Sequence, residues 1–218
     1  MPLFPSTEST LLLPGPAGDI EILAMPQDEK RAHLKNATAI ICHPHPLFGG
    51  TMHNKVVTTL ARVFRDIGLR SVRFNFRGVG KSSGIHDEGR GEVDDLLTIA
   101  AWIKNIFPND PIWLAGFSFG AYVATKGAMQ ILPQQLVTIA PQVSRFSQDN
   151  LALVTCPWLL VQGEKDEVVS AAEVFAWIET LPHQPDIIRM PTAGHFFHGQ
   201  LLELRRLLED RLRFVMRV

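Results

Sequence analysis

The feature that most constrains the fold is an alternation of short apolar runs with longer stretches of helical periodicity. Most of the runs contain four to six residues bounded by Gly, Pro or Asp, which is typical of buried strands. They cover residues 10–13, 20–24, 37–42, 69–74, 111–115, 136–140, 158–162 and 187–190. Apolar residues at helical spacing occupy residues 56–64, 93–103, 121–128 and 174–178, between the later runs. This order predicts an α/β fold with a mostly parallel sheet and helices on both faces.

The two ends of the chain depart from this alternation. No helical stretch separates the first two runs, so Gly15 to Gly18 is predicted to turn a hairpin. The last twenty residues place Leu201, Leu204, Leu208 and Leu212 on one stripe, with Arg and Glu opposite. This pattern predicts a terminal helix packed on the sheet, and a partner-binding helix is the alternative.

Composition limits the class of protein. A chain of 218 residues, 46% of them hydrophobic, can bury one large core, which predicts a single domain over residues 1–218. The formal net charge is -1 without long runs of one sign, so we expect no nucleic-acid partner. Apolar runs fall short of the ~18 residues of a membrane span, and no signal-peptide pattern opens the chain, so we expect a cytoplasmic protein. Nothing in the composition predicts an oligomeric state.

Cysteine usage fits a reducing compartment. Cys42 and Cys156 each adjoin an apolar run, which is typical of reduced buried thiols. A single disulfide between them is the alternative.

The segment NFRGVGKSSG, residues 75–84, ends like a nucleotide-binding P-loop. A P-loop needs a glycine where Asn75 stands, and it needs a helix to begin at once. Glycines at positions 84, 89 and 91 disfavour a helix starting at Lys81. We therefore predict a loop without a nucleotide.

Residues 113–124, WLAGFSFGAYVA, contain a G-x-S-x-G pattern between an apolar run and a helical stretch. In this context the pattern predicts a nucleophile elbow, a sharp strand-to-helix turn that projects the serine hydroxyl. Gly116 and Gly120 suit this turn because a Cβ at either position would collide with neighbouring backbone. Ser118 would lie at a helix N-terminus, where the helix dipole favours developing negative charge. An ordinary turn serine is the alternative.

A serine hydroxyl is a weak nucleophile, so the elbow requires a histidine base and a carboxylate, in the chain order Ser, acid, His. Asp166 lies just beyond the run 158–162, and His195 just beyond 187–190. Catalytic groups of open parallel sheets gather at the carboxyl ends of the strands, so these are the predicted acid and base for Ser118. Neighbouring side chains of the same types are the alternatives: Glu164, Glu167 and His198.

These motifs together resemble the α/β-hydrolase superfamily, and within it a group of small bacterial serine hydrolases without a lid. The resemblance is carried by CHPHPLFGGTMHNKVV at residues 42–57, by the segment at 75–84, and by GFSFGAY at 116–122. It implies an eight-stranded, mostly parallel sheet and carboxylesterase-type activity. It also implies Ser118 as nucleophile, Asp166 as acid and His195 as base. The resemblance further implies that the loop at 77–82 is structural.

Two backbone N–H groups are expected to bind the oxyanion of a tetrahedral intermediate. One is the N–H of Phe119, next to the nucleophile, and the other comes from the loop after the run 37–42. Two prolines in that loop have no N–H to donate. His45 is the predicted second donor, because it lies two residues after His43, as the donor does in the similar hydrolases that have a His-Gly motif, and Leu47 is the alternative.

Histidines near these loops raise the alternative of a metal site: His43, His45, His53, His195 and His198. No H-E-x-x-H or paired-cysteine spacing accompanies them, and a metal site would leave the serine elbow without a role. We predict neither a metal nor a cofactor.

Substrate access follows from loop length. Only about fifteen residues follow Pro141 before the next apolar run, so we predict an open site without a substantial cap. Four aromatic residues either line an acyl pocket or belong to the core: Phe48, Phe117, Phe119 and Phe196. The predicted activity is hydrolysis of carboxylic esters in a small-molecule or acylated substrate. A thioesterase or peptidase with the same triad, and a non-enzymatic binding protein of this fold, are the alternatives.

Overall fold

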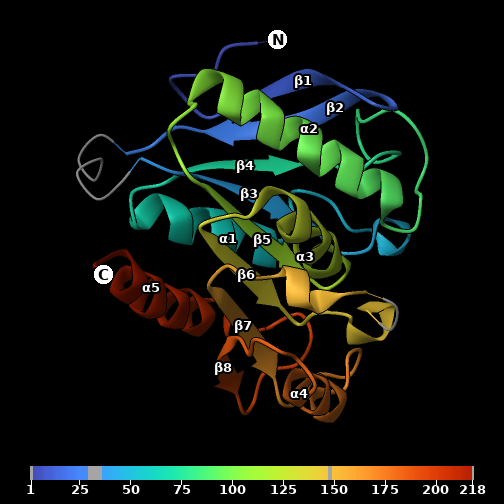
Figure 1. Ribbon diagram of the computed structural model, residues 1–218, viewed down its shortest axis with the longest axis vertical. Coiled ribbons are helices and arrows are strands. Elements are labelled where there is room, and N and C mark those ends of the chain that lie inside the picture. The colour runs from blue at the N-terminus through green and yellow to red at the C-terminus, as the bar shows by residue number, and fades with distance from the viewer. Residues whose placement is uncertain (1, 29–35, 147–148, 218) are drawn as a thin grey trace.

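The computed structural model describes residues 2–28, 36–146 and 149–217 around one eight-stranded sheet (Figure 1). Its strands are β1 (Ser9–Gly15), β2 (Gly18–Met25), β3 (Thr38–Cys42), β4 (Arg70–Phe74), β5 (Ile112–Phe117), β6 (Gln135–Ile139), β7 (Trp158–Gly163) and β8 (Asp186–Met190). They lie in the order β1-β2-β4-β3-β5-β6-β7-β8. Among the described strands, β2 pairs antiparallel with both β1 and β4, and every other pairing is parallel, so the prediction of a mostly parallel sheet is confirmed.

Helices cover both faces of the sheet (Figure 1). They are α1 (Lys55–Asp66), α2 (Arg90–Ile106), α3 (Phe119–Ile131), α4 (Ala171–Glu179) and α5 (Leu201–Arg217). Helices α1 and α5 pack on one face, and α2, α3 and α4 on the other. In the described part of the chain, no helix has both the length and the apolar character needed to cross a membrane.

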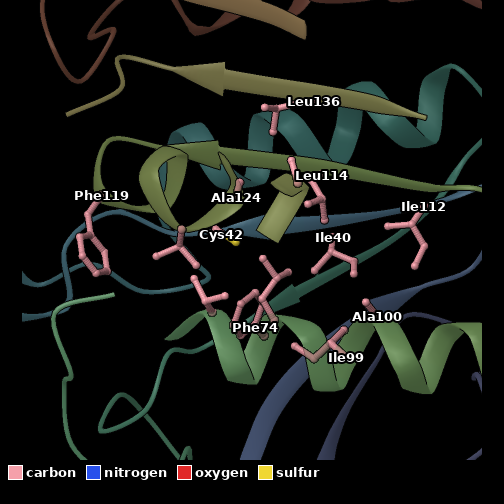
Figure 2. Close-up of a cluster of buried hydrophobic side chains, with 14 of the residues drawn as sticks. Ile40, Cys42, Phe74, Ile99, Ala100, Ile112, Leu114, Phe119, Ala124 and Leu136 are labelled. Carbon is pink, nitrogen blue, oxygen red and sulfur yellow. The ribbon is translucent and has the colours of Figure 1, made fainter. Parts of the chain in front are cut away.

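Each face of the sheet carries its own buried core. On the side of α2 and α3, Ile40 and Leu114 from the sheet meet Ile99 and Ala124 from the two helices (Figure 2). Apolar side chains from strands and helices interlock there, and such close packing holds the strand ends in place.

The terminal helix packs inward, as the first of the two interpretations predicts. Leu204, Leu208 and Leu212 of α5 are fully buried in the core that α1 also lines. The hairpin at the other end is also confirmed, with Gly15 paired to Gly18 across the turn.

The loop after β4 is structural. The Ser82 hydroxyl donates to the Asn75 carbonyl at 2.6 Å and accepts the Glu21 N–H at 2.9 Å. The next helix, α2, begins at Arg90, so no helix begins at Lys81. In a P-loop the hydroxyl at this position would bind a metal ion, whereas the Ser82 hydroxyl forms hydrogen bonds within the fold.

Both cysteines are free thiols. Burial raises the pKa of Cys156 to about 11, and it raises the pKa of the fully buried Cys42 well above its usual range. Neither thiol is therefore activated as a nucleophile at neutral pH.

Candidate active site

The elbow between β5 and α3 consists of Ser118 alone, with φ +56° and ψ -117°. A positive φ is disfavoured for a residue with a side chain, and it persists only where the surroundings enforce it. A Cβ on Gly116 would collide with the Gly120 carbonyl, and a Cβ on Gly120 would collide with the carbonyl oxygens of Cys42 and His43. The two glycines therefore let α3 begin directly against the end of β3.

The structure brings the three predicted residues together at the carboxyl edge of the sheet. His195 Nε2 lies 3.1 Å from Ser118 Oγ, and His195 Nδ1 lies 2.9 Å from Asp166 Oδ2. Ser118 is 8% exposed and His195 is 2% exposed. The side chains follow β5, β7 and β8, so the parallel topology itself gathers them. The arrangement can move a proton from the serine to an imidazole whose other nitrogen faces a carboxylate.

Asp166 is held by several donors. Its Oδ1 accepts the N–H groups of Val168 at 2.9 Å and Val169 at 2.7 Å, and its Oδ2 accepts the Gln162 amide at 3.2 Å. Burial acts to raise the pKa of Asp166, but hydrogen bonds from His195 and from the two valine N–H groups outweigh it and hold that pKa below its ordinary value. The carboxylate is ionised at neutral pH. Gln162 was not predicted, and its only signal is a polar residue at the end of an apolar run.

The alternative acids and base lie elsewhere. Glu167 accepts the backbone N–H of His195 at 3.1 Å, so it supports the loop rather than the imidazole. Glu164 and His198 are exposed. Among the described residues, Asp166 is the acid whose side chain contacts the ring of His195.

A cleft of about 340 Å³ opens beside Ser118. It is lined by Pro44, His45, Phe48, Gly49, Gly50, Asn54, Ser118, Val168, His195 and Phe196. Phe48 is 87% exposed and Phe196 is 43% exposed, whereas Phe117 and Phe119 are fully buried in the core. Of the four aromatic residues, two therefore line the cleft and two belong to the core.

The loop before α1 supplies most of the residues that line this cleft. A Cβ on Gly50 would collide with the carbonyl of Pro44, so glycine permits the tight return after the short 3-10 turn η2 (Pro46–Phe48). His45 lines the cleft, whereas Leu47 does not and its side chain is 69% exposed.

The histidine at the start of this loop, His43, is engaged with the backbone at both ring nitrogens. His43 is buried, its Nε2 accepts the Phe76 N–H at 3.0 Å, and its Nδ1 lies 2.6 Å from the Pro44 carbonyl. Burial lowers the pKa of His43 to about 4, against a smaller opposing effect of the Pro44 hydrogen bond. Within the described ranges, no three His, Cys, Asp or Glu side chains are grouped as a metal site.

Comparison with known proteins identifies relatives with the alpha/beta hydrolase fold. A family model for the alpha/beta hydrolase fold matches residues 44–144. The crystal structure of XC6422 from Xanthomonas campestris, an α/β serine hydrolase without lid, superposes with a TM-score of 0.92 at 45% identity, covering 98% of this chain and 97% of that one. An uncharacterized protein of Rickettsia prowazekii is 35% identical over 185 residues, which are 80% of this chain and 77% of the relative.

Another relative has a named activity. The lysophosphatidylserine lipase ABHD12 of Macaca fascicularis is 35% identical over 175 residues. The match covers 62% of this chain but 44% of the lipase, so the chain spans less than half of that relative.

Proposed function

This chain belongs to the α/β-hydrolase family, in its group of small serine hydrolases without a lid, and from that premise we propose that it hydrolyses carboxylic esters through Ser118. One observation carries the proposal: His195 lies 3.1 Å from the Ser118 hydroxyl and 2.9 Å from the Asp166 carboxylate. These distances are within hydrogen-bond reach, as transfer of the serine proton requires.

The reaction follows from the roles of these atoms. His195 Nε2 takes the hydroxyl proton as Ser118 Oγ attacks the ester carbonyl, and Asp166 stabilises the resulting imidazolium through Nδ1–H. Collapse of the tetrahedral intermediate breaks the bond to the alcohol oxygen, which receives the proton from Nε2. Water then attacks the acyl-enzyme while His195 Nε2 takes its proton, and Ser118 Oγ receives that proton as the carboxylic acid is released. No other reactant is consumed.

The oxyanion is assigned to two backbone N–H groups, those of Phe119 and His45. Phe119 is the first residue of α3, so its N–H has no acceptor within the helix and the helix dipole adds to its effect. His45 is preferred to Leu47 because it lines the cleft that contains Ser118. Each such donor is worth roughly 3 kcal/mol of transition-state stabilisation.

The ester class is supported by the walls of the cleft. Phe48, Val168 and Phe196 are apolar and exposed at its mouth, which suits an apolar acyl or alcohol group. The lipase relative has a name that also denotes ester cleavage.

The decisive experiment uses a fluorescent fluorophosphonate, which phosphonylates an activated serine and releases fluoride. We expect the purified protein to be labelled at Ser118 and to hydrolyse p-nitrophenyl butyrate. Ser118→Ala should abolish labelling and lower kcat by roughly 10⁴- to 10⁶-fold. Ser144→Ala removes an exposed hydroxyl and serves as the matched control, with labelling and turnover unchanged.

Three outcomes would contradict the proposal in whole or in part. Wild-type turnover in a folded Ser118→Ala variant would remove the serine from the mechanism. Absence of labelling and of hydrolysis in the folded wild type would favour a binding protein of this fold. Hydrolysis of thioesters or peptide bonds in preference to esters would change the proposed leaving group but leave Ser118 as the nucleophile.

A further inference from the structure

Arg145 connects three segments around the candidate active site. It lies in the 3-10 turn η3 (Val143–Phe146), which follows β6. Its Nε donates to Gln142 Oε1 at 3.0 Å, and its Nη1 donates to Glu88 Oε2 at 3.1 Å. Its Nη2 lies 3.3 Å from His45 Nε2. We propose that Arg145 is a positioning residue that holds the N–H of His45 in place for the oxyanion.

The guanidinium also packs against the other proposed donor. Its Cζ lies 4.9 Å from the centre of the Phe119 ring, within the range of a cation–π contact. The ring of His45 lies 4.8 Å from the same phenyl ring. Both residues whose N–H groups are assigned to the oxyanion are therefore in contact with one cation, and this cation fixes their side chains relative to each other.

The protonation of His45 supports this role. Burial, and then the neighbouring His86 and Arg145, lower the pKa of His45, so its ring is neutral at neutral pH. A neutral imidazole can accept a hydrogen bond at one of its two nitrogens. Two donors face the ring: Arg145 at Nε2 and the Leu47 N–H, which lies 3.3 Å from Nδ1. A hydrogen bond from a cation is the stronger of the two. Contacts at both edges of the ring, with Arg145 at Nε2 and the Leu47 N–H at Nδ1, therefore fix the orientation of the His45 ring.

The contact with Glu88 is better explained by positioning than by stability. The Glu88 side chain is 60% exposed, and exposed ion pairs contribute little to folding. Glu88 nevertheless has a φ of +52°, a conformation that non-glycine residues keep only where their surroundings hold them. The next residue, Gly89, lies so close to α3 that a Cβ would collide with Tyr122. The loop before α2 thus packs closely on α3, and Glu88 pairs there with the guanidinium of Arg145.

This inference rests on the proposed ester hydrolysis and is tested with Arg145→Met, which keeps the length of the alkyl chain and removes the guanidinium. We expect kcat to fall roughly 10- to 100-fold with KM little changed, because a displaced donor weakens the transition state more than bound substrate. An alkylboronic acid forms a tetrahedral adduct on Ser118, so its affinity should fall by a similar factor. Arg145→Lys keeps the charge without the planar fork and should recover part of the loss.

The matched control is Arg206→Met, which removes an exposed arginine paired with Asp210 at 3.3 Å on α5 and should leave every constant unchanged. Unchanged kcat and boronate affinity in a folded Arg145→Met variant would overturn the inference, as would a loss confined to KM.

If Arg145→Met does not fold, Glu88→Gln tests the same contact from its other side, since it alters an exposed carboxylate. A smaller fall in kcat at constant KM supports positioning, and unchanged kcat refutes it. Failure of the proposed function would look different, because the wild type itself would then neither hydrolyse esters nor bind the boronic acid.

Discussion

At the scale of single residues, the carboxylate of Asp166 is held by hydrogen bonds at both of its oxygens. One of its oxygens accepts two backbone N–H groups, and the other faces His195 and the amide of Gln162. Asp166→Asn places an amide in this pocket, and its NH2 cannot accept from Nδ1–H of His195. We expect kcat for ester hydrolysis to fall roughly 10⁴-fold through loss of the required tautomer.

Glu164→Gln is the control for this variant, because Glu164 lies in the same loop but is exposed. Steady-state kinetics of both variants, with circular dichroism to verify folding, make the comparison. Normal turnover in folded Asp166→Asn would shift the acid role to Glu167, whose carboxylate already accepts the backbone N–H of His195.

At the scale of elements, sequence patterns predicted which segments form strands and helices better than where they end. The run at 111–115 became β5 (Ile112–Phe117), and the stretch at 93–103 became α2 (Arg90–Ile106). Apolar periodicity marks the buried face of an element, whereas its ends depend on hydrogen bonds. Helix α2 begins where Glu92 Oε2 accepts the Gly89 N–H at 2.8 Å, a cap that periodicity does not include.

The geometry of the elbow follows from local sequence. Two glycines of α3, one at the elbow and one farther along the helix, allow this geometry to be tested. Gly120→Ala would force a Cβ into the carbonyl oxygens of Cys42 and His43, which are backbone atoms of a central strand and its exit. We expect it to lower the free energy of unfolding by about 3 kcal/mol or more and to reduce turnover. Gly127→Ala, later in α3, meets only side-chain atoms of Leu96 and Leu114.

Those leucine side chains can move, and alanine favours a helix over glycine, so Gly127→Ala should change the free energy of unfolding by no more than about 1 kcal/mol. Urea titration measures both variants. Equal stabilities for the two would show that the elbow tolerates a Cβ, contrary to the contacts around Gly120.

At the scale of the whole molecule, the sheet explains why part of the site was predictable. Strand order places the ends of β5, β7 and β8 at one edge, so Ser118, Asp166 and His195 could be predicted to meet. Arg145 could not, because its partners Glu88 and His45 lie 57 and 100 residues away on loops above the sheet. Such contacts depend on loop conformation and leave no periodic signal in the sequence.

The connection between β6 and β7 determines how the site meets its substrate. Its described residues form two 3-10 turns, η3 (Val143–Phe146) and η4 (Leu151–Leu153), rather than an inserted helical cap. Lids restrict access until they open, and here the mouth beside Ser118 is bordered directly by the exposed Phe48 and Phe196. We therefore expect ester hydrolysis to depend on dissolved substrate alone.

Rates with tributyrin, followed by titration of released acid across its solubility limit, test this expectation. The curve should saturate smoothly and stay level once droplets form, as it should for p-nitrophenyl butyrate, which stays dissolved at assay concentrations. A sharp rise at the limit would mean that an oil–water interface changes access to Ser118. Because Phe48 already lies exposed at the mouth, such a rise would require a rearrangement of the loops around it.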